Sequence, residues 1–365
     1  MRAVKILLVV LVLAGWSEAA SAADRIDMDP ARARFAPSVT PELLFATAVG
    51  GEGDQWFNMV GFKGSKIAAG NKDRLVCLVQ INDDGTLEAK VKGDLRKSSK
   101  DFKRQLPNGG TVGPYSFGYN QVHKILQQPW LKVGGKQLWG WSEQQAKSSS
   151  VKYSPFMSDS RIRTLFLAPD GHGVAVGSAD GGNTCLRAHP ADINQPMAMG
   201  LGYGTTGGGG GGLSSWVFDI SPKAEVGPVA MVFRGQVCSA AWDRWGRMLL
   251  GGQALTKTGS ASVFGYDDGA GVMLVNRDWS DAVFAAHIGK GGESSASGMI
   301  WALAINNELG LAAAAGWMDG DFVGPGSLQP RSGGGKDAFM AVWRLWTPAD
   351  YQVAIEAEAA AQVAE

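Results

Sequence analysis

The sequence repeats one β-hairpin four times, and this repetition constrains the fold more than any other feature. In each copy an apolar strand runs into a polar turn, and a second strand follows that ends in small residues and glycine. The copies are WFNMVGFKGSKIAAG (56–70), IRTLFLAPDGHGVAVG (162–177), VCSAAWDRWGRMLLGG (237–252) and IWALAINNELGLAAAAG (300–316). Apolar strands joined by a short polar turn predict antiparallel hairpins.

Further strand-like segments follow each hairpin. We predict third strands at 74–81, 214–221, 260–267 and 337–346, and fourth strands within 83–93, 223–235 and 267–278. A fifth, less regular copy lies at 115–142. Four antiparallel strands per unit, repeated about every 50 to 70 residues, are typical of propeller blades. Abundant glycine, 51 residues of 365, fits a chain with many turns.

The fold prediction is therefore all-β: a single β-propeller of five four-stranded blades, with six as the alternative, over residues 42–346. The last copy stops after its third strand, at Trp346. The segment ELLFATAVGG (42–51) has the pattern of the missing fourth strand. We expect this N-terminal strand to complete the last blade and close the ring, which would remove an exposed sheet edge.

Two segments resemble the bacterial exported β-propeller repeat family. They are LLFATAVGGEGDQWFNMVGF (43–62) and GGGKDAFMAVWRL (333–345). Repeats of that family combine a Gly-Gly-x-Gly-Asp corner with a Gly-Gly-x-Asp-Ala-Phe strand. The copies at 43–81 and 288–346 match best, although the second lacks the aspartate of the corner. The resemblance implies a propeller in an extracytoplasmic setting and implies no single activity.

The N-terminus has the pattern of a secretory signal peptide. A cationic start (1–5) precedes an apolar run (6–16), and small residues stand at Ala20-Ser21-Ala22. An uncleaved membrane anchor is the alternative, but the run is about half the length that a spanning helix needs. We predict a signal peptide at 1–22, a linker at 23–41, and a short helical or disordered tail at 347–365. The protein is then exported, periplasmic or secreted, without membrane insertion after signal removal.

Charge and cysteine content exclude several classes of function. Lys plus Arg (34) equals Asp plus Glu (34), so no net field would attract nucleic acid. Cys77, Cys185 and Cys238 are the cysteines, and their disulfide state stays open. No CxxC motif is present, so neither a zinc ribbon, a thioredoxin-like pair nor a c-type haem site is indicated, and no cofactor is identified.

The glycine corner Gly50-Gly51-Glu52-Gly53-Asp54 raises the question of a phosphate loop. Such a loop opens into a helix and carries a lysine at a fixed offset, but here the strand-like run QWFNMVGF follows. We interpret the corner as a turn in which Asp54 caps its own backbone. The glycine run 207–212 has no such lysine either and lies in the longest insertion, 180–213.

Metal binding has one candidate. The four histidines lack metal-ligand spacing, whereas Asp319 and Asp321 in Asp319-Gly320-Asp321 offer clustered oxygens that suit calcium. Because Asp-Gly is also the commonest hairpin turn, a purely structural turn is the competing interpretation.

Loop aromatics suggest a binding function. Trp139, Trp141 and Trp317 fall near predicted loops or strand ends, where indoles could stack on sugar rings or on a partner's surface. We predict a non-enzymatic binding or scaffold module that acts through rim loops on a protein or polysaccharide of the cell envelope. A hydrolase or lyase with carboxylates at the channel mouth is the alternative. No G-x-S-x-G elbow is present, and no catalytic residue can be assigned.

Overall fold

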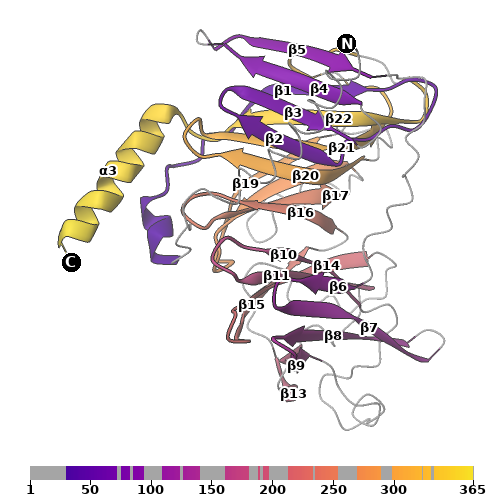
Figure 1. Ribbon diagram of the computed structural model, residues 1–365, viewed down its shortest axis with the longest axis vertical. Coiled ribbons are helices and arrows are strands. Elements are labelled where there is room, and N and C mark those ends of the chain that lie inside the picture. Colours follow the sequence, from indigo (N-terminus) through magenta and orange to yellow (C-terminus); the bar gives the residue numbers. More distant parts are fainter. Residues whose placement is uncertain are drawn as a thin grey trace, which may run out of the picture.

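The chain folds into five four-stranded antiparallel sheets, which confirms the predicted all-β propeller architecture with five blades (Figure 1). The computed structural model describes residues 30–71, 75–82, 85–93, 109–123, 126–139, 161–180, 188–189, 192–196, 213–232, 235–253, 269–288, 298–322, 324–329 and 333–364. The predicted signal peptide, the glycine run 207–212, Trp141 and Cys185 lie outside these residues.

The sheets follow the chain in order and are numbered accordingly. Sheet 1 contains β2 (Met59–Lys63), β3 (Lys66–Gly70), β4 (Val76–Ile81) and β5 (Leu87–Lys92), and sheet 2 contains β6 (Gly110–Val112), β7 (Tyr115–His123), β8 (Leu126–Val133) and β9 (Lys136–Trp139). Sheet 3 contains β10 (Arg161–Leu167), β11 (Gly173–Asp180), β14 (Leu213–Ile220) and β15 (Val226–Val232). Sheet 4 contains β16 (Gln236–Trp242), β17 (Met248–Gln253), β18 (Ala270–Val275) and β19 (Ala282–Ile288). Sheet 5 contains β20 (Gly298–Asn306), β21 (Leu311–Asp319), β22 (Lys336–Arg344) and β1 (Glu42–Val49), and a two-stranded ribbon of β12 (Ala188–His189) and β13 (Asp192–Pro196) lies between β11 and β14.

All four predicted hairpins are present, but one third strand was predicted wrongly. The segment 260–267, predicted as the third strand of sheet 4, lies outside the described residues. The third strand is instead β18, which the sequence analysis assigned as the fourth, and β19 takes the fourth place. Both 260–267 and β18 contain apolar, strand-like residues, so the local pattern alone could not separate them. The less regular copy at 115–142 forms sheet 2 together with β6.

The N-terminal strand β1 completes sheet 5, as predicted. It pairs antiparallel with β22, from Glu42 opposite Arg344 to Val49 opposite Ala338. The outer edge of β1 is covered in turn, because the Ala46 N–H donates to the Pro325 carbonyl at 2.9 Å. An edge strand that is covered in this way cannot template pairing with another chain.

The five sheets stack face to face in the order 1, 5, 4, 3, 2, as the successive layers of Figure 1 show. The first strands β2, β20, β16 and β10 carry much of the contact between neighbouring sheets. Apolar side chains fill the interfaces, such as Phe57 and Ile67 of sheet 1 against Met340 of sheet 5. Among the described strands, none of the extensive packing joins sheet 1 to sheet 2, so closure of the ring stays a prediction.

A repeated bulge explains the glycine that ends two of the four hairpin motifs, Gly252 and Gly316. The register of the first two strands shifts at the same place in three sheets, next to Ile162, Val237 and Ile300. In sheets 4 and 5 the backbone carbonyl just before the bulge lies against the glycine of the opposite strand. A Cβ on Gly316 would lie 1.8 Å from the Met299 carbonyl oxygen, and one on Gly252 would lie 1.6 Å from that of Gln236. Only glycine fits such a close backbone approach.

The short turns share one geometry. Gly85, Gly171, Gly246 and Gly310 have φ between 62° and 87°, and each donates its N–H to the carbonyl three residues earlier. This left-handed conformation favours glycine, which accounts for the recurring glycine in the predicted turns.

Each sheet has two different ends. First and second strands are joined by short turns at one end, the turn end, and in sheets 1 to 4 so are third and fourth strands; examples are 168–172 and 221–225 in sheet 3. In sheet 5 the fourth strand, β1, comes from the N-terminal part of the chain. Second and third strands, and successive sheets, are connected at the opposite end, the loop end. In sheet 2 the connection between the second and third strands is the tight hairpin β7–β8. The longer connections therefore leave from the loop end: 93–109, 140–160, 181–212, 254–269, 289–297 and 320–335.

The described segments on either side of sheet 5 both lie at the turn end, where η1 contacts α3. The 3-10 helix η1 (Pro30–Phe35) precedes β1, and the helix α3 (Pro348–Ala364) follows β22. The predicted helical tail is thus a helix, and its start is capped as the sequence suggests: the Thr347 N–H donates to Asp350 at 2.9 Å, and the Asp350 N–H donates to Thr347 Oγ1 at 3.2 Å. Within the described residues, no helix has the length and apolar character to cross a membrane.

Candidate functional site

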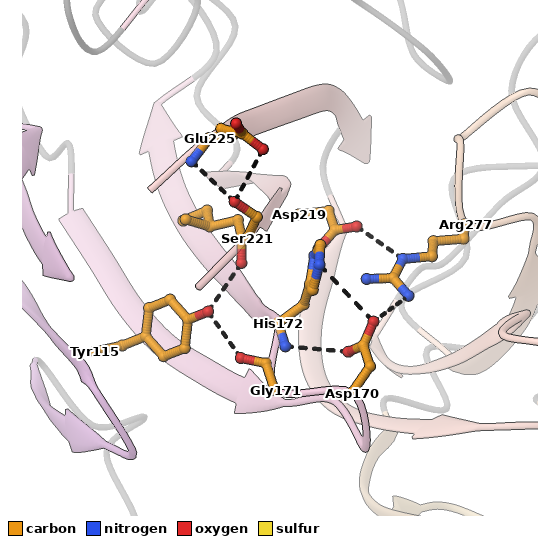
Figure 2. A network of polar contacts seen from close by, with 9 residues as sticks. Tyr115, Asp170, Gly171, His172, Asp219, Ser221, Glu225 and Arg277 are labelled. Atoms are coloured by element: carbon orange, nitrogen blue, oxygen red, sulfur yellow. Dashed lines mark hydrogen bonds and ion pairs between the residues drawn. The ribbon is translucent and has the colours of Figure 1, made fainter. Parts of the chain in front are cut away.

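A cluster of ionisable side chains lies at the turn end where sheets 2, 3 and 4 meet (Figure 2). We call Tyr115, Asp170, His172, Asp219 and Arg277 the polar cluster. Tyr115 starts β7, Asp170 and His172 lie in and just after the β10–β11 turn, Asp219 ends β14, and Arg277 lies in the β18–β19 turn. It brings acidic and basic side chains of two sheets within ion-pair distance of one another.

Arg277 bridges the two aspartates of the neighbouring sheet. Its Nε donates to Asp219 Oδ2 at 2.9 Å and its Nη1 donates to Asp170 Oδ2 at 2.6 Å. His172 lies between the same carboxylates, with Nδ1 3.0 Å from Asp219 Oδ1 and Nε2 3.8 Å from Asp170 Oδ2. The Asp170 carboxylate also accepts the His172 backbone N–H at 3.0 Å, which fixes the turn.

Electrostatics favour the ionised form of the Asp219 carboxylate. Burial alone would raise the pKa of Asp219, but the hydrogen bond from His172 and the charge and hydrogen bond of Arg277 outweigh it, so the pKa is lowered. Burial lowers and the two carboxylates raise the pKa of Arg277, with a net upward shift. A guanidinium between two carboxylates is therefore charged at any physiological pH.

Tyr115 joins sheet 2 to this cluster. Its hydroxyl is the donor to two carbonyl oxygens of sheet 3, that of Gly171 at 2.9 Å and that of Ile220 at 3.0 Å. Burial, with smaller contributions from the nearby aspartates, raises the pKa of Tyr115 to about 12. The phenol thus stays protonated and serves as a fixed donor rather than a base.

The chemistry available to the polar cluster is limited. General acid–base catalysis by two carboxyl groups needs one whose pKa is raised toward neutrality and that can reach a substrate. Here both carboxylates bind the same arginine, and the pKa of Asp219 moves the other way. Burial does raise the pKa of Asp243, but this side chain is fully buried against Arg247. The polar cluster is better suited to joining three sheets than to catalysis.

The glycine corner at the loop end also has a structural role, different in one detail from the prediction. Asp54 was predicted to cap its own backbone, but its Oδ1 accepts the backbone N–H of Lys336 at 3.0 Å, and it is Gln55 Oε1 that accepts the N–H of Gly51 in the corner, at 3.0 Å. A Cβ on Gly333 would lie 2.5 Å from the Gly51 nitrogen, so the two glycine-rich segments touch backbone to backbone. The corner and the Lys336-Asp337-Ala338-Phe339 strand, the two motifs of the resemblance, thus lie against each other.

The predicted aromatic binding residues do not form one surface. Trp317 lies at the loop end of β21, but its side chain is only 7 % exposed, and Lys336 Nζ sits 4.2 Å from the ring centroid. The indole face predicted to stack on a ligand is covered, which corrects the expectation for this residue. Trp139 ends β9, and Trp141 lies outside the described residues.

The predicted calcium candidates lie beside Trp317. Asp319 ends β21 and Asp321 follows it, both exposed at the loop end. The described residues contain no group of three His, Cys, Asp or Glu side chains placed to hold a metal ion. Calcium at this turn therefore stays a prediction.

Two of the three cysteines can be placed. Cys77 is buried in β4 and Cys238 is half-buried in β16, and neither forms a disulfide within the described residues. Burial raises the pKa of the Cys77 thiol to about 12, which fits the predicted inert core thiol.

Sequence analysis did not single out Arg277 or His172. No local motif marks them, because the partners Asp170 and Arg277 are 107 residues apart and belong to different sheets. The one available signal was the turn sequence around Asp170-Gly171-His172, which places polar side chains at a hairpin end.

No family model and no curated protein sequence matches the chain, so its resemblance to the exported repeat family stays a prediction. Comparison with solved structures finds the WD40 β-propeller domain of Doa1, at 9% identity over 83% of this chain and 97% of that one, with a TM-score of 0.34. A luciferin-regenerating enzyme has 8% identity over 84% and 98% of the two chains and a TM-score of 0.29. The computationally designed protein Ika8 has 10% identity over 80% and 99% and a TM-score of 0.24.

Proposed function

We propose that the chain is a non-enzymatic binding module that contacts its partner through the loop end. One observation carries this proposal: the longer connections leave every sheet from that end, whereas the turn end holds short turns. Variable loops on a repeated frame are where binding residues concentrate in such folds.

Turn-to-turn hydrogen bonds make the frame suitable for this role. Tyr115 and Arg277 join sheets 2, 3 and 4 as described above. The Arg244 N–H in sheet 4 donates to Asn307 Oδ1 in sheet 5 at 2.9 Å, and Asn306 Nδ2 donates to the Gly64 carbonyl in sheet 1 at 3.5 Å. With all five turn ends connected, the loops project from strands whose relative positions are fixed, which lowers the entropic cost of binding.

The partner that we propose is a protein or polysaccharide of the cell envelope. The signal-peptide pattern of residues 1–22 supports an exported protein, and the balanced charge of the chain disfavours nucleic acid. Described loop-end residues that are exposed include Glu52, Asp321 and Leu328, a mixed polar and apolar set that suits either class of partner.

The hydrolase or lyase alternative has less support. It requires an accessible pair of carboxyl groups. Of the described carboxylates with a shifted pKa, Asp219 and Asp243 bind arginines at the turn end, and Asp350 caps the start of α3. No specific observation on the described residues favours this second function.

Site-specific photo-crosslinking in the envelope of the source organism tests the proposal. A photoreactive amino acid replaces Leu328 at the loop end, and in a matched control it replaces Glu308 at the turn end; both side chains are exposed. We expect a discrete crosslinked partner, protein or polysaccharide, from position 328 and none from position 308. Equal crosslinking from both positions, or none from several loop-end positions, would contradict binding through the loop end.

A further inference from the structure

The segment that precedes β1 contacts the rest of the protein outside any sheet, through isolated hydrogen bonds and apolar packing. Residues 36–41 form no strand, and Pro37 is buried. Arg247 Nη1 donates to the Pro37 carbonyl at 2.9 Å, and the Thr40 N–H donates to the Leu345 carbonyl at 3.0 Å. Phe35 and Val39 pack on the apolar cluster of sheets 4 and 5 from either side of the proline.

The surface that receives Pro37 is organised by its own contacts. The rings of Trp245 and Trp346 meet edge to face at 5.7 Å, and Tyr351 of α3 meets Trp245 at the same distance. The Arg247 guanidinium lies 5.2 Å from the Trp346 centroid, and its Nε donates to Asp243 Oδ2 at 2.6 Å. None of these contacts involves residues 30–41, so the arginine would keep its position if that segment left.

The segment and its surface are complementary in charge. Glu358 of α3 is 4% exposed and forms ion pairs with Arg32 of η1 and, at 3.8 Å, with Arg244. A buried carboxylate that meets a basic residue five positions before the buried proline would reject a segment with the opposite charge.

The arginine also has unused hydrogen-bonding capacity. Arg247 is 4% exposed, and its Nη2 has no hydrogen-bond partner in the described part of the chain. A buried N–H without an acceptor costs free energy. The segment 36–41 therefore satisfies this surface incompletely, and a peptide with one more suitably placed acceptor would bind it better.

We propose that Trp245, Arg247, Trp346, Tyr351 and Glu358 form a recognition site for a basic and apolar peptide, which residues 30–41 occupy in cis as an autoinhibitory contact. This site lies at the turn end, so it is separate from the loop-end surface of the proposed function. Release of residues 30–41 would open it to a peptide of the same chemistry from another chain.

Binding of a peptide in trans to the full-length chain tests the proposal. The probe is a fluorescently labelled synthetic peptide, PARARFAPSVTP, with the sequence of residues 30–41. The variant Val39→Asp weakens the cis segment without altering the site. By fluorescence anisotropy we expect the probe to bind Val39→Asp at least tenfold more tightly than the wild type. A probe in which the residue at the position of Arg32 is glutamate should bind at least tenfold less tightly. The proposal would be overturned if the probe bound detectably neither to the wild type nor to a folded Val39→Asp variant.

Hydrogen exchange of the wild-type chain keeps the proposal testable should the variant fail to fold. Opening of the cis segment predicts that the Thr40 amide exchanges at least tenfold faster than the amides of β22. Charge reversal at Glu358→Arg should accelerate it further, and the double variant Arg32→Glu/Glu358→Arg should restore the original rate. The exposed Arg344–Glu42 pair, 3.1 Å apart, is the control, because its reversal should leave the Thr40 amide unchanged. Exchange of Thr40 only together with β22 would show that the segment is ordinary core and does not release.

Discussion

Asp54 accepts a hydrogen bond at 3.0 Å from the backbone N–H of Lys336, 282 residues further along the chain. The contact joins the segment that leads into sheet 1 to the last strand supplied by the C-terminal half, beside the place where β1 pairs with β22. The glycine corner therefore lies next to the place where the N-terminal strand completes sheet 5, and both hold the same strand, β22.

Replacing Asp54 should test that feature. Asp54→Ala removes the acceptor for the Lys336 N–H, and we expect the free energy of unfolding to fall by about 1–3 kcal/mol, as when a buried donor loses its acceptor. Asp54→Asn keeps an oxygen in place and should cost less. Urea denaturation followed by tryptophan fluorescence measures both variants. Equal stability of Asp54→Ala and the wild type would show that the corner needs only its glycines.

Gly316 gives a second, sterically defined prediction. A Cβ at this position would lie 1.8 Å from the Met299 carbonyl, a backbone atom that cannot move without breaking the bulge. We expect Gly316→Ala to destabilise the chain by about 1–3 kcal/mol or more, as overpacking does. Gly227→Ala is the matched control, because a Cβ there would lie 3.5 Å from the nearest atom, an ordinary contact. Thermal unfolding should separate the two variants clearly, and similar melting temperatures would contradict the role of the bulge.

The predictable part of the fold is the part that local pattern specifies. The four hairpins and β1 as the missing strand follow from alternation and turn residues. The third strand of sheet 4 did not, because both 260–267 and β18 contain apolar, strand-like residues, and the choice depends on pairing with β17, as in Met248 opposite Val275. Trp317 was expected to be exposed, since its sequence position near a loop does not reveal that Lys336 lies over it.

The polar cluster could not be predicted because it depends on the order in which the sheets stack. Asp170 and Arg277 meet only because sheets 3 and 4 are neighbours and their turns lie at the same end. The sequence contains the residues, but nothing in their spacing reports that adjacency. The same holds for Arg247 and Pro37, which are 210 residues apart.

Removal of Arg277 should weaken the junction of sheets 3 and 4 in a pH-dependent way. Arg277→Met leaves the Asp170 and Asp219 carboxylates partly buried without their guanidinium, and we expect a loss of about 2–3 kcal/mol at pH 7. The folded-state pKa of Asp219 is lowered, so its contribution to stability is complete above the unfolded value of about 3.9 and is lost as the pH falls through the folded pKa.

The difference in unfolding free energy between Arg277→Met and the wild type should therefore be larger at pH 7 than at pH 3. Urea titrations at both pH values measure it. Lysine cannot reach both carboxylates with a planar fork, so the unfolding free energy of Arg277→Lys should lie between that of Arg277→Met and that of the wild type. A difference that is independent of pH would show that Arg277 stabilises the junction by packing alone.

Thiol reactivity gives a prediction that needs no mutation. The pKa of Cys77 is raised to about 12 by burial, so less than about one thiol in a thousand is ionised at pH 8, and the thiolate is the reactive form. Cys238 is half-buried in β16 and accessible to a small reagent. Native protein treated with iodoacetamide at pH 8 and digested for mass spectrometry should therefore show modified Cys238 and unmodified Cys77. In guanidinium chloride both should react at similar rates. Rapid native modification of Cys77 would mean that sheet 1 opens locally at β4, against the packing of this strand between β3 and β5.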